Sequence, residues 1–209
     1  MPADHRSCSP GQELARPAVE VAPALLNARL TAGGVTVRLT EVEAYAGESD
    51  PGSHAFRGRT PRTAVMFGPA GRAYVYFSYG MHWCLNVVTG PDGQAGAVLL
   101  RAGEVADGCD AARERRPGAS DRDLCRGPAR LCRALGITGD QDSTDLLDPT
   151  SPVRLLLPPS PVEAGLVRSG PRVGVAGAGA LTPWRFWLAD EPSVSVYRPA
   201  VARRRTIVS

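Results

Sequence analysis

The sequence predicts an α+β fold, a single domain with an antiparallel β-sheet core flanked by short helices and long loops. Three observations support this prediction. The chain has 209 residues, which is the size of one domain. Several short segments alternate apolar and polar residues between turn sequences, as half-buried strands do, whereas few segments have helical spacing. The 23 glycines and 19 prolines are enough for many loops and too few for a collagen-like or disordered chain.

The N-terminal region combines a polar tail with one short helix. Residues 1–12 have no hydrophobic pattern, so we expect a flexible tail there and a folded domain over 13–209. Apolar residues at helical spacing predict a short helix within 17–30. A turn at 32–34 separates this helix from the first strand.

The central region predicts strands on both sides of one long loop. Alternation of apolar and polar residues predicts a strand over 35–45. Residues 46–72 are rich in Gly, Pro, Ser and Arg and have no period, so we expect a loop, and loops of this length in a folded domain usually carry function. Segments 74–77 and 83–88 predict the two strands of a hairpin that turns at 78–81.

The remaining part of the chain predicts shorter elements. A helix opens at Gly127-Pro128 and ends at Gly136, because proline suits the first helical position and glycine suits the position after the last turn. The other expected elements are a short strand over 97–100, a charged helix over 104–116, a loop over 138–152, and strands over 153–157, 172–175 and 184–188.

Charge and composition restrict the function classes. The net charge of +3 permits nucleic acid as a partner without demanding it. All 24 basic residues are arginines, so no lysine can form a Schiff base, and covalent amine catalysis is excluded except at the N-terminus. The five cysteines form no CxxC pair, and the chain has no signal sequence and no membrane-length apolar run, so we expect a cytoplasmic protein with reduced thiols. The three histidines are far apart, which argues against a metal site.

Two glutamates continue the first strand toward the long loop. Strict alternation places Glu41, Glu43 and Tyr45 on the same face as the apolar residues of 35–39. A carboxylate at this place is partly dehydrated, which raises its pKa toward the range that a general base needs. Two other interpretations remain open. The glutamates are solvated or paired with arginine, or they act as a pair on a glycosidic bond, since same-face neighbours on a strand lie about 7 Å apart.

Aromatic residues gather around this strand end and the hairpin. Tyr74 and Tyr76 share one face of a strand, and Tyr79 lies at the hairpin tip, a position that suits a wedge entering a base stack. Together with Tyr45 and His54, these flat rings near a carboxylate suit a slot for a nucleobase. Ordinary packing of aromatic residues in a sheet is the alternative for Tyr76.

Polar residues interrupt the apolar pattern of the next strands. Asn86 and Arg101 are flanked by apolar residues, so each is either a structural group with a partner or a site residue. Arg57, Arg59 and Arg62 lie in the long loop, where they either meet phosphates or form a solvated basic surface.

One long combination of residues is specific. It consists of EAY at 43–45, a histidine nine residues after that tyrosine, and the pattern YVYxxYGMxxCxN at 74–86. This combination closely resembles the alkyladenine (3-methyladenine) DNA glycosylase family. The similarity covers nearly the whole chain after about residue 13 and continues through GAVLLRAGE (96–104), LCRGPARLCRALGI (124–137) and RVGVAGAGALTPWRFWL (172–188).

The resemblance implies catalytic and pocket roles. Glu43 resembles the general base that activates the attacking water, and Arg101 resembles the residue that helps to hold the water and the sugar-phosphate. The implied pocket residues for a flipped base are Tyr45, His54, Tyr76 and Asn86. Asn86 is implied to obstruct the amino group of normal guanine.

The resemblance also implies contacts with DNA. Tyr79 resembles the residue that fills the gap left by the base, and Met66 resembles a DNA-contacting residue of the loop. Arg57 and Arg59 are assigned to the phosphates from their place in that loop. Glu41 matches no catalytic role in the family, which weakens the interpretation of paired carboxylates.

The implied function is that of a monofunctional DNA glycosylase. Such an enzyme flips alkylated or deaminated purines (3-methyladenine, 7-methylguanine, ethenoadenine, hypoxanthine) out of duplex DNA and hydrolyses the N-glycosidic bond, which starts base excision repair. We expect a monomer without metal, cofactor or membrane, whose partner is double-stranded DNA with damaged purines and which associates with the nucleoid while it acts. Two alternatives remain: a damage-binding protein on the same scaffold, and a hydrolase of free nucleosides.

Two positions depart from the family pattern. Thr63 stands where asparagine is frequent, and Ser78 stands where an aliphatic residue is usual beside the inserted tyrosine. We expect these departures to alter the efficiency of base flipping and to leave the chemistry intact.

Overall fold

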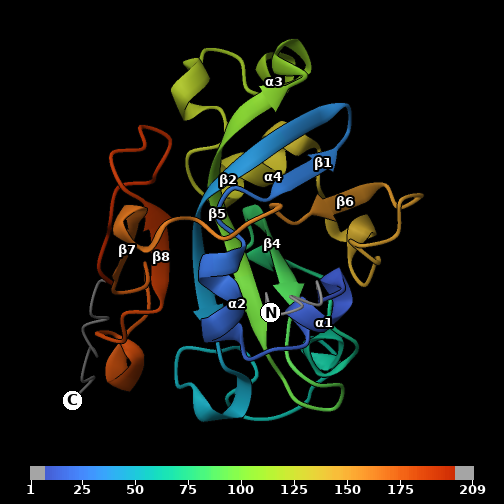
Figure 1. The fold of residues 1–209 in the computed structure, drawn as a ribbon, viewed down its shortest axis with the longest axis vertical. Helices are drawn as coiled ribbons and strands as arrows, with labels where there is room; N and C mark the ends of the chain where they lie inside the picture. Colours follow the sequence, from blue (N-terminus) through green and yellow to red (C-terminus); the bar gives the residue numbers. More distant parts are fainter. Residues whose placement is uncertain (1–7, 201–209) are drawn as a thin grey trace, which may run out of the picture.

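A single antiparallel sheet organises residues 8–200, which are the part of the chain that the computed structural model describes (Figure 1). Its strands are β1 (Arg29–Ala32), β2 (Val35–Tyr45), β3 (Ala73–Ser78), β4 (His82–Val88), β5 (Ala97–Asp107), β6 (Val153–Leu156), β7 (Val167–Gly170) and β8 (Arg185–Leu188). Six strands follow the order β3-β4-β5-β2-β1-β6, and β8 joins the sheet beside β2 and pairs with β7. The long strands β2 and β5 form the centre, with β1 beside the first half of β2 and β8 beside its second half.

Short helices connect and cover the strands, which confirms the predicted α+β class. The α-helices are α1 (Pro10–Leu14), α2 (Ala18–Ala24), α3 (Cys109–Arg115) and α4 (Pro128–Leu135). The 3-10 helices are η1 (Gly47–Ser49), η2 (Ala64–Phe67), η3 (Asp121–Asp123), η4 (Gly139–Gln141), η5 (Ala164–Leu166) and η6 (Gly177–Gly179). Within residues 8–200, no helix is both long enough and apolar enough to cross a membrane.

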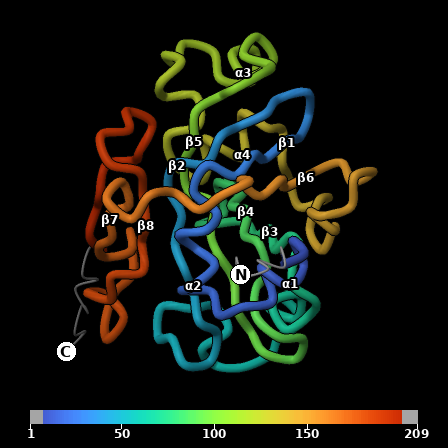
Figure 2. The backbone as a smooth tube through the Cα atoms, viewed as in Figure 1, coloured from blue at the N-terminus to red at the C-terminus, as the bar shows by residue number. Residues whose placement is uncertain are grey.

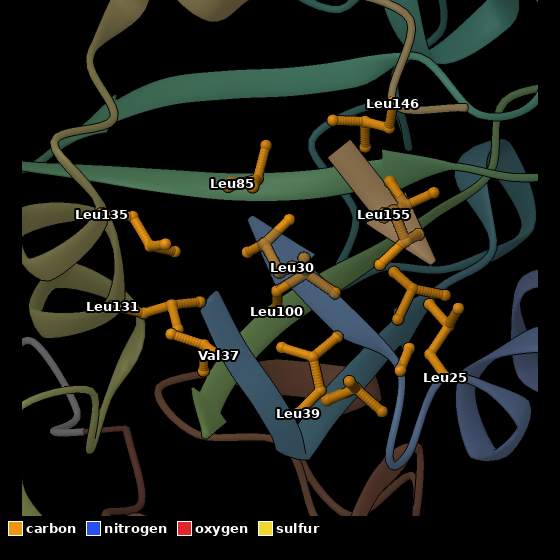
Figure 3. Close-up of a cluster of buried hydrophobic side chains, with 14 of the residues drawn as sticks. Leu25, Leu30, Val37, Leu39, Leu85, Leu100, Leu131, Leu135, Leu146 and Leu155 are labelled. Atoms are coloured by element: carbon orange, nitrogen blue, oxygen red, sulfur yellow. The ribbon is translucent and has the colours of Figure 1, made fainter. Parts of the chain in front are cut away.

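The main core lies where α2 and α4 pack against the sheet. Figure 3 shows leucine side chains from strands and helices meeting in one interior, among them Leu131 and Leu135 of α4 beside Leu85 and Leu100 of the sheet. These four side chains are at most 1% exposed. Burial of a leucine contributes about 1.5–3 kcal/mol, so this cluster fixes α4 on the sheet. The strands β7 and β8 lie along one side of the molecule, next to β2 (Figure 2).

A double bulge at the centre of the sheet changes which residues face the core. The register shifts on both sides of Glu41, because Thr40 is an extra residue on β2 and Arg101 is an extra residue on β5. Core residues of β2 occupy odd positions up to Leu39 and even positions from Val42 onward. An extra residue in one strand moves all later side chains to the other face.

The bulge corrects one prediction from the sequence. The expectation that Glu41, Glu43 and Tyr45 share a face with the apolar residues of 35–39 is wrong. The three residues do share a face with one another, but the extra residue turns that face away from the main core. Two carboxylates therefore avoid the apolar interior and point toward a polar site beside β8.

Further corrections concern element boundaries. The predicted strand 97–100 extends to Asp107, and the predicted helix 104–116 is reduced to α3, because pairing with β2 keeps these residues extended until Gly108 turns the chain with a φ of 75°. The last residues of the predicted helix 17–30 belong to β1, which pairs with β2.

The predicted strand over 172–175 is also wrong. These residues form a turn, and the strand that pairs with β8 is β7, a few residues earlier. The side chain of Arg172 explains the turn, because it is fully buried and bound to Asp50 and to the Ala44 carbonyl instead of continuing a ladder. Residues 1–7 of the expected tail lie outside the described residues, and α1 already begins at Pro10.

Other predicted elements are confirmed. The hairpin of β3 and β4, helix α4, and strands β6 and β8 lie where the sequence predicts them. The local signals are also present. Pro128 occupies the first turn of α4, and Gly136 follows the helix with a left-handed φ of 68°.

Because Gly103 is tightly packed against β2 near the bulge, we expect Gly103→Ala to destabilise the protein. A Cβ at this position would lie 2.3 Å from Val37 Cγ1 and 2.4 Å from the Arg38 carbonyl oxygen, and a backbone oxygen in a sheet cannot move away freely. We expect a loss of about 1–3 kcal/mol in the free energy of unfolding, measured by urea denaturation. Gly165→Ala is the matched control, because a Cβ there meets no atom within 4 Å. Equal stability of both variants would contradict the packing argument.

Candidate active site

A cavity of about 840 Å³ opens between the β3–β4 hairpin, the end of β2 and the loops that follow β2 and β7. The predicted site residues that line it are Tyr45, His54, Met66, Tyr76, Tyr79, Asn86 and Arg101. The volume is within the range of small-molecule sites, and the lining combines aromatic rings with a few polar groups. The structure therefore brings most of the predicted site residues together.

The Glu43 carboxylate lies behind the wall of this cavity. Its Oε2 accepts a hydrogen bond from the Tyr45 hydroxyl at 2.9 Å, and its Oε1 accepts one from the Val173 backbone N–H at 2.6 Å. Arg101 Nη1 lies 3.3 Å from Oε2. Tyr45, Arg101 and Val173 all line the cavity, whereas Glu43 itself is 0% exposed. Glu43 is therefore joined to the cavity wall through all three residues.

Glu41 has a different environment from Glu43. It is fully buried and accepts hydrogen bonds from Arg101 Nε at 2.8 Å and from Arg185 Nε at 2.7 Å, as well as from Ser195. Burial alone would raise the pKa of Glu41, but the charges of the two arginines hold it below its usual value. The expectation of a raised pKa is therefore wrong for Glu41, which is a permanently charged partner of the arginines and does not line the cavity.

Three aromatic rings form one wall of the cavity. His54 and Tyr76 meet edge to face with ring centres 4.6 Å apart, and Tyr74 lies 5.5 Å from Tyr76. The His54 Nδ1 and the Tyr74 hydroxyl are 3.0 Å apart, within hydrogen-bond distance. The Arg62 guanidinium lies over Tyr76, 5.5 Å from the ring centre. Flat surfaces of this kind can hold a flat π-rich ligand by stacking.

Burial and nearby charges determine the protonation states of Tyr45, Tyr76 and His54. Burial raises the pKa of Tyr45 and of Tyr76, and the nearby negative charge of Glu43 adds to the effect on Tyr45, so both phenols stay neutral. His54 lines the cavity with part of its side chain exposed, and partial desolvation together with the positive charge of Arg62 lowers its pKa to about 4. The imidazole is therefore neutral near pH 7 and can accept as well as donate a hydrogen bond.

Tyr79 lies at the tip of the hairpin, where its side chain is 82% exposed. Its φ of 51° and the φ of 67° at Gly80 define a turn closed by the hydrogen bond from the Met81 N–H to the Ser78 carbonyl. A left-handed conformation is uncommon for a tyrosine and costs about 1–3 kcal/mol. Phe77 and Met81 are also exposed, so the tip projects as an apolar point beside the cavity.

The remaining predicted residues occupy different positions. Asn86 is buried and donates a hydrogen bond to the Tyr74 carbonyl, so it has a structural partner. It also lines the cavity. Met66 is 2% exposed and lines the cavity, and its contact with DNA stays a prediction. Arg57 and Arg59 are exposed on the loop and do not line the cavity, and their contact with phosphates stays a prediction.

Thr63 and Ser78, the two positions that depart from the family pattern, have different environments. Thr63 is buried, and its hydroxyl accepts a hydrogen bond from the Thr60 N–H and donates to the Gly58 carbonyl, which closes the loop on itself. Ser78 ends β3 opposite His82 and lines the cavity beside Tyr79. Their effect on base flipping stays a prediction.

Sequence reasoning missed a buried ion pair that shapes the cavity. Arg172 and Asp50 are at most 1% exposed, and the guanidinium binds both carboxylate oxygens. The same guanidinium lies 4.6 Å from the ring centre of Tyr45 and 5.2 Å from that of Trp184. The pair fixes the Tyr45 ring and the turn that carries Val173. Since Asp50 and Arg172 are far apart in the sequence, no local sequence pattern could predict their contact.

The antiparallel α+β fold carries a cavity that combines aromatic rings with the Arg101 guanidinium, and the buried Glu43 carboxylate lies next to it. Comparison with known proteins specifies the class. Residues 12–192 match the family described as methylpurine-DNA glycosylase (MPG). The chain belongs to this family, whose members hydrolyse N-glycosyl bonds in DNA repair.

Curated relatives agree with this assignment. A protein of Streptomyces avermitilis is 53% identical over 91% of this chain and 92% of its own length, and one of Nocardia farcinica is 59% identical over 83% of this chain and 84% of its own. A protein of Frankia casuarinae is 56% identical over 88% of this chain and 90% of its own length. All three carry the name "Putative 3-methyladenine DNA glycosylase".

The low pKa of His54 makes the stability of the protein depend on pH. Because the pKa of His54 is about 4 in the folded protein and its usual value is 6.5, the unfolded chain binds the proton first as the pH falls. The contribution of this group to stability is therefore present above pH 6.5 and is lost between pH 6.5 and about 4. Arg62→Gln should raise the pKa of His54, which NMR titration of the imidazole measures. An unchanged midpoint in the variant would rule out the influence of Arg62.

Proposed function

We propose that this protein is a monofunctional DNA glycosylase that flips damaged purines out of duplex DNA and hydrolyses their N-glycosidic bond. The substrate class comprises 3-methyladenine, 7-methylguanine, ethenoadenine and hypoxanthine. The observation that carries the proposal is the Glu43 carboxylate, which is bonded to Tyr45 and Val173 directly behind an aromatic cavity of about 840 Å³. Membership of the methylpurine-DNA glycosylase family supports the same chemistry.

Binding begins at the surface around the cavity. Arg57 and Arg59 on the exposed loop attract the phosphate backbone. Tyr79, held outward at the hairpin tip, enters the base stack and takes the place of the extruded nucleotide. Unstacking costs a few kcal/mol and costs least for a damaged base that pairs poorly, which favours lesions over normal purines.

The cavity then holds the extruded base. The rings of Tyr45, His54 and Tyr76 supply stacking surfaces, and neutral His54 supplies a hydrogen bond without placing a positive charge against a cationic alkylated purine. Asn86, held by the Tyr74 carbonyl, is a rigid obstacle in the cavity wall against the amino group of guanine.

Hydrolysis needs one water molecule and one base. Glu43 removes a proton from the water, the water oxygen bonds to the anomeric carbon, and the electrons of the broken C–N bond leave with the purine. A cationic purine such as 3-methyladenine or 7-methylguanine leaves as a neutral molecule without a general acid, whereas a neutral base such as ethenoadenine or hypoxanthine must gain a proton. Arg101, between Glu43 and the cavity, stabilises the carboxylate and the sugar-phosphate. Glu43 is fully buried in the free protein, so the water needs a path through the cavity wall.

The absence of lysine predicts the product. A glycosylase that also cuts the strand uses an amine to form a Schiff base with the sugar; this chain has no lysine, and its N-terminal amine has no role in the proposed site. The reaction therefore ends at an abasic site. A non-catalytic damage-binding protein and a hydrolase of free nucleosides are the alternatives that the following experiments exclude or support.

Glu43→Gln tests the catalytic proposal. Duplexes with one hypoxanthine, ethenoadenine or 3-methyladenine are incubated with protein and then treated with alkali. We expect strand breaks only after alkali, a loss of at least about 100-fold in excision rate for the variant, and retained binding of the duplex. Breaks without alkali would contradict the monofunctional proposal. Absence of excision by the unaltered protein would favour the damage-binding alternative.

Tyr79→Ala tests the wedge. We expect the variant to bind a lesion in duplex DNA about tenfold more weakly and to bind the same lesion in a single strand nearly as well, because only the duplex has a stack to fill. Binding is measured by fluorescence anisotropy. Leu156→Ala, at an exposed apolar side chain of β6 that does not line the cavity, is the comparison variant and should bind both substrates as the unaltered protein does. An equal loss on both substrates would remove the wedge role, and activity on free nucleosides independent of Tyr79 would support the nucleoside hydrolase.

A further inference from the structure

The orientation of the Arg101 guanidinium is fixed by groups that do not face the cavity. Its Nε donates to Glu41 Oε1 at 2.8 Å, and its Nη2 donates to Ser195 Oγ at 3.3 Å. The remaining nitrogen, Nη1, lies 3.3 Å from Glu43 Oε2. Because a guanidinium is planar and rigid, contacts on two of its nitrogens determine where the third one points. Glu41 and Ser195 therefore decide how Arg101 meets Glu43.

Glu41 is itself saturated by partners from distant parts of the chain. Besides Arg101, it accepts hydrogen bonds from Arg185 Nε at 2.7 Å, from the Ser195 hydroxyl at 2.9 Å and from the Ser195 N–H at 2.6 Å. The side chain is 0% exposed and lies outside the cavity, so it cannot touch a bound nucleotide. Any influence of Glu41 on the reaction must pass through Arg101.

Ser195 belongs to a segment, residues 191–198, that crosses the site after β8. This segment has anchors that do not involve the Ser195 hydroxyl. Arg126 Nε donates to the Val194 carbonyl at 2.8 Å, and the Ser193 hydroxyl lies 2.9 Å from that of Thr40. The Gly174 N–H donates to the Arg198 carbonyl at 3.2 Å. Loss of the Ser195 hydroxyl alone should therefore leave the segment in place.

We propose that Glu41 and the Ser195 hydroxyl are positioning residues that hold Arg101 in the orientation required for hydrolysis. The proposal rests on the glycosylase function proposed above and assigns a role to a carboxylate that has no catalytic role in the family resemblance. Without these two contacts, the guanidinium is free to rotate and to pair with both oxygens of Glu43. A carboxylate paired in this way is a poorer acceptor for the proton of a water molecule.

The expected signature is a slower chemical step with unchanged binding. For Ser195→Ala, we expect the single-turnover excision rate to fall about tenfold while the Kd for lesion duplex stays within about twofold. Ser195→Thr keeps a hydroxyl and should restore most of the rate. Glu41→Gln should have a larger effect than Ser195→Ala. Thermal unfolding of each variant identifies any that fail to fold, and Ser195→Ala, the mildest change, keeps the experiment interpretable.

Ser193→Ala is the matched control on the same segment. Its hydroxyl contacts Thr40 and Glu191 and does not touch Arg101 or Glu41. We expect an excision rate within about twofold of the unaltered protein. The proposal is overturned if Ser195→Ala excises at the unaltered rate. It is also overturned if Ser193→Ala loses as much activity as Ser195→Ala, or if threonine at 195 fails to rescue, since a merely structural role would produce either result.

A second measurement does not depend on excision. In ¹⁵N-labelled protein without DNA, the buried Arg101 Nε–H should exchange slowly with solvent, and Ser195→Ala should accelerate this exchange at least about fivefold, whereas Ser193→Ala should not. If the unaltered protein excises no lesion, the glycosylase proposal fails, while this exchange rate still decides whether Ser195 holds Arg101. Equal protection in the unaltered protein and in Ser195→Ala would contradict the positioning role.

Discussion

Four buried charges balance one another at the centre of the sheet, and the rest of the site depends on this balance. Glu41 and Glu43 come from β2, Arg101 from β5 and Arg185 from β8, and all four are at most 5% exposed. Each charge would cost several kcal/mol to bury alone, so removal of one partner leaves an uncompensated charge. The ion pairs tie three strands together where the double bulge at Thr40 interrupts the ladder.

The bulge and the ion pairs together keep the two glutamates out of the apolar core. A regular strand would send the two glutamates into the leucine core, where no partner could neutralise them. The extra residues turn Glu43 toward the cavity and bring Arg101 between the two carboxylates. One irregularity therefore provides both the stability of the buried charges and the access of Glu43 to the cavity wall. Glu43, the proposed base, is therefore held on a rigid strand, whereas Arg57 and Tyr79, the proposed DNA contacts, lie on a loop and a turn.

Local chemistry explains which features could be predicted from the sequence. The hairpin with Tyr79 at its tip follows from alternation and from a glycine at the turn, and α4 follows from Pro128 and Gly136 at its ends. The set of cavity residues followed from a long motif. In contrast, the alternation of residues 35–45 looks regular in the sequence, so nothing indicated that Thr40 is an extra residue. A bulge depends on the register of the partner strand, which is a property of two segments rather than one.

The sequence by itself determined the fold class, the aromatic character of the site and the exclusion of amine chemistry, because these depend on local periodicity and on residue types. The tertiary structure alone decided which charges meet. Glu41 and Arg185 are 144 positions apart and Arg172 and Asp50 are 122 apart, yet each pair is in direct contact. A buried ion requires a partner but does not specify which one, and only the packing of β2, β5, β8 and the segment after β8 makes that choice.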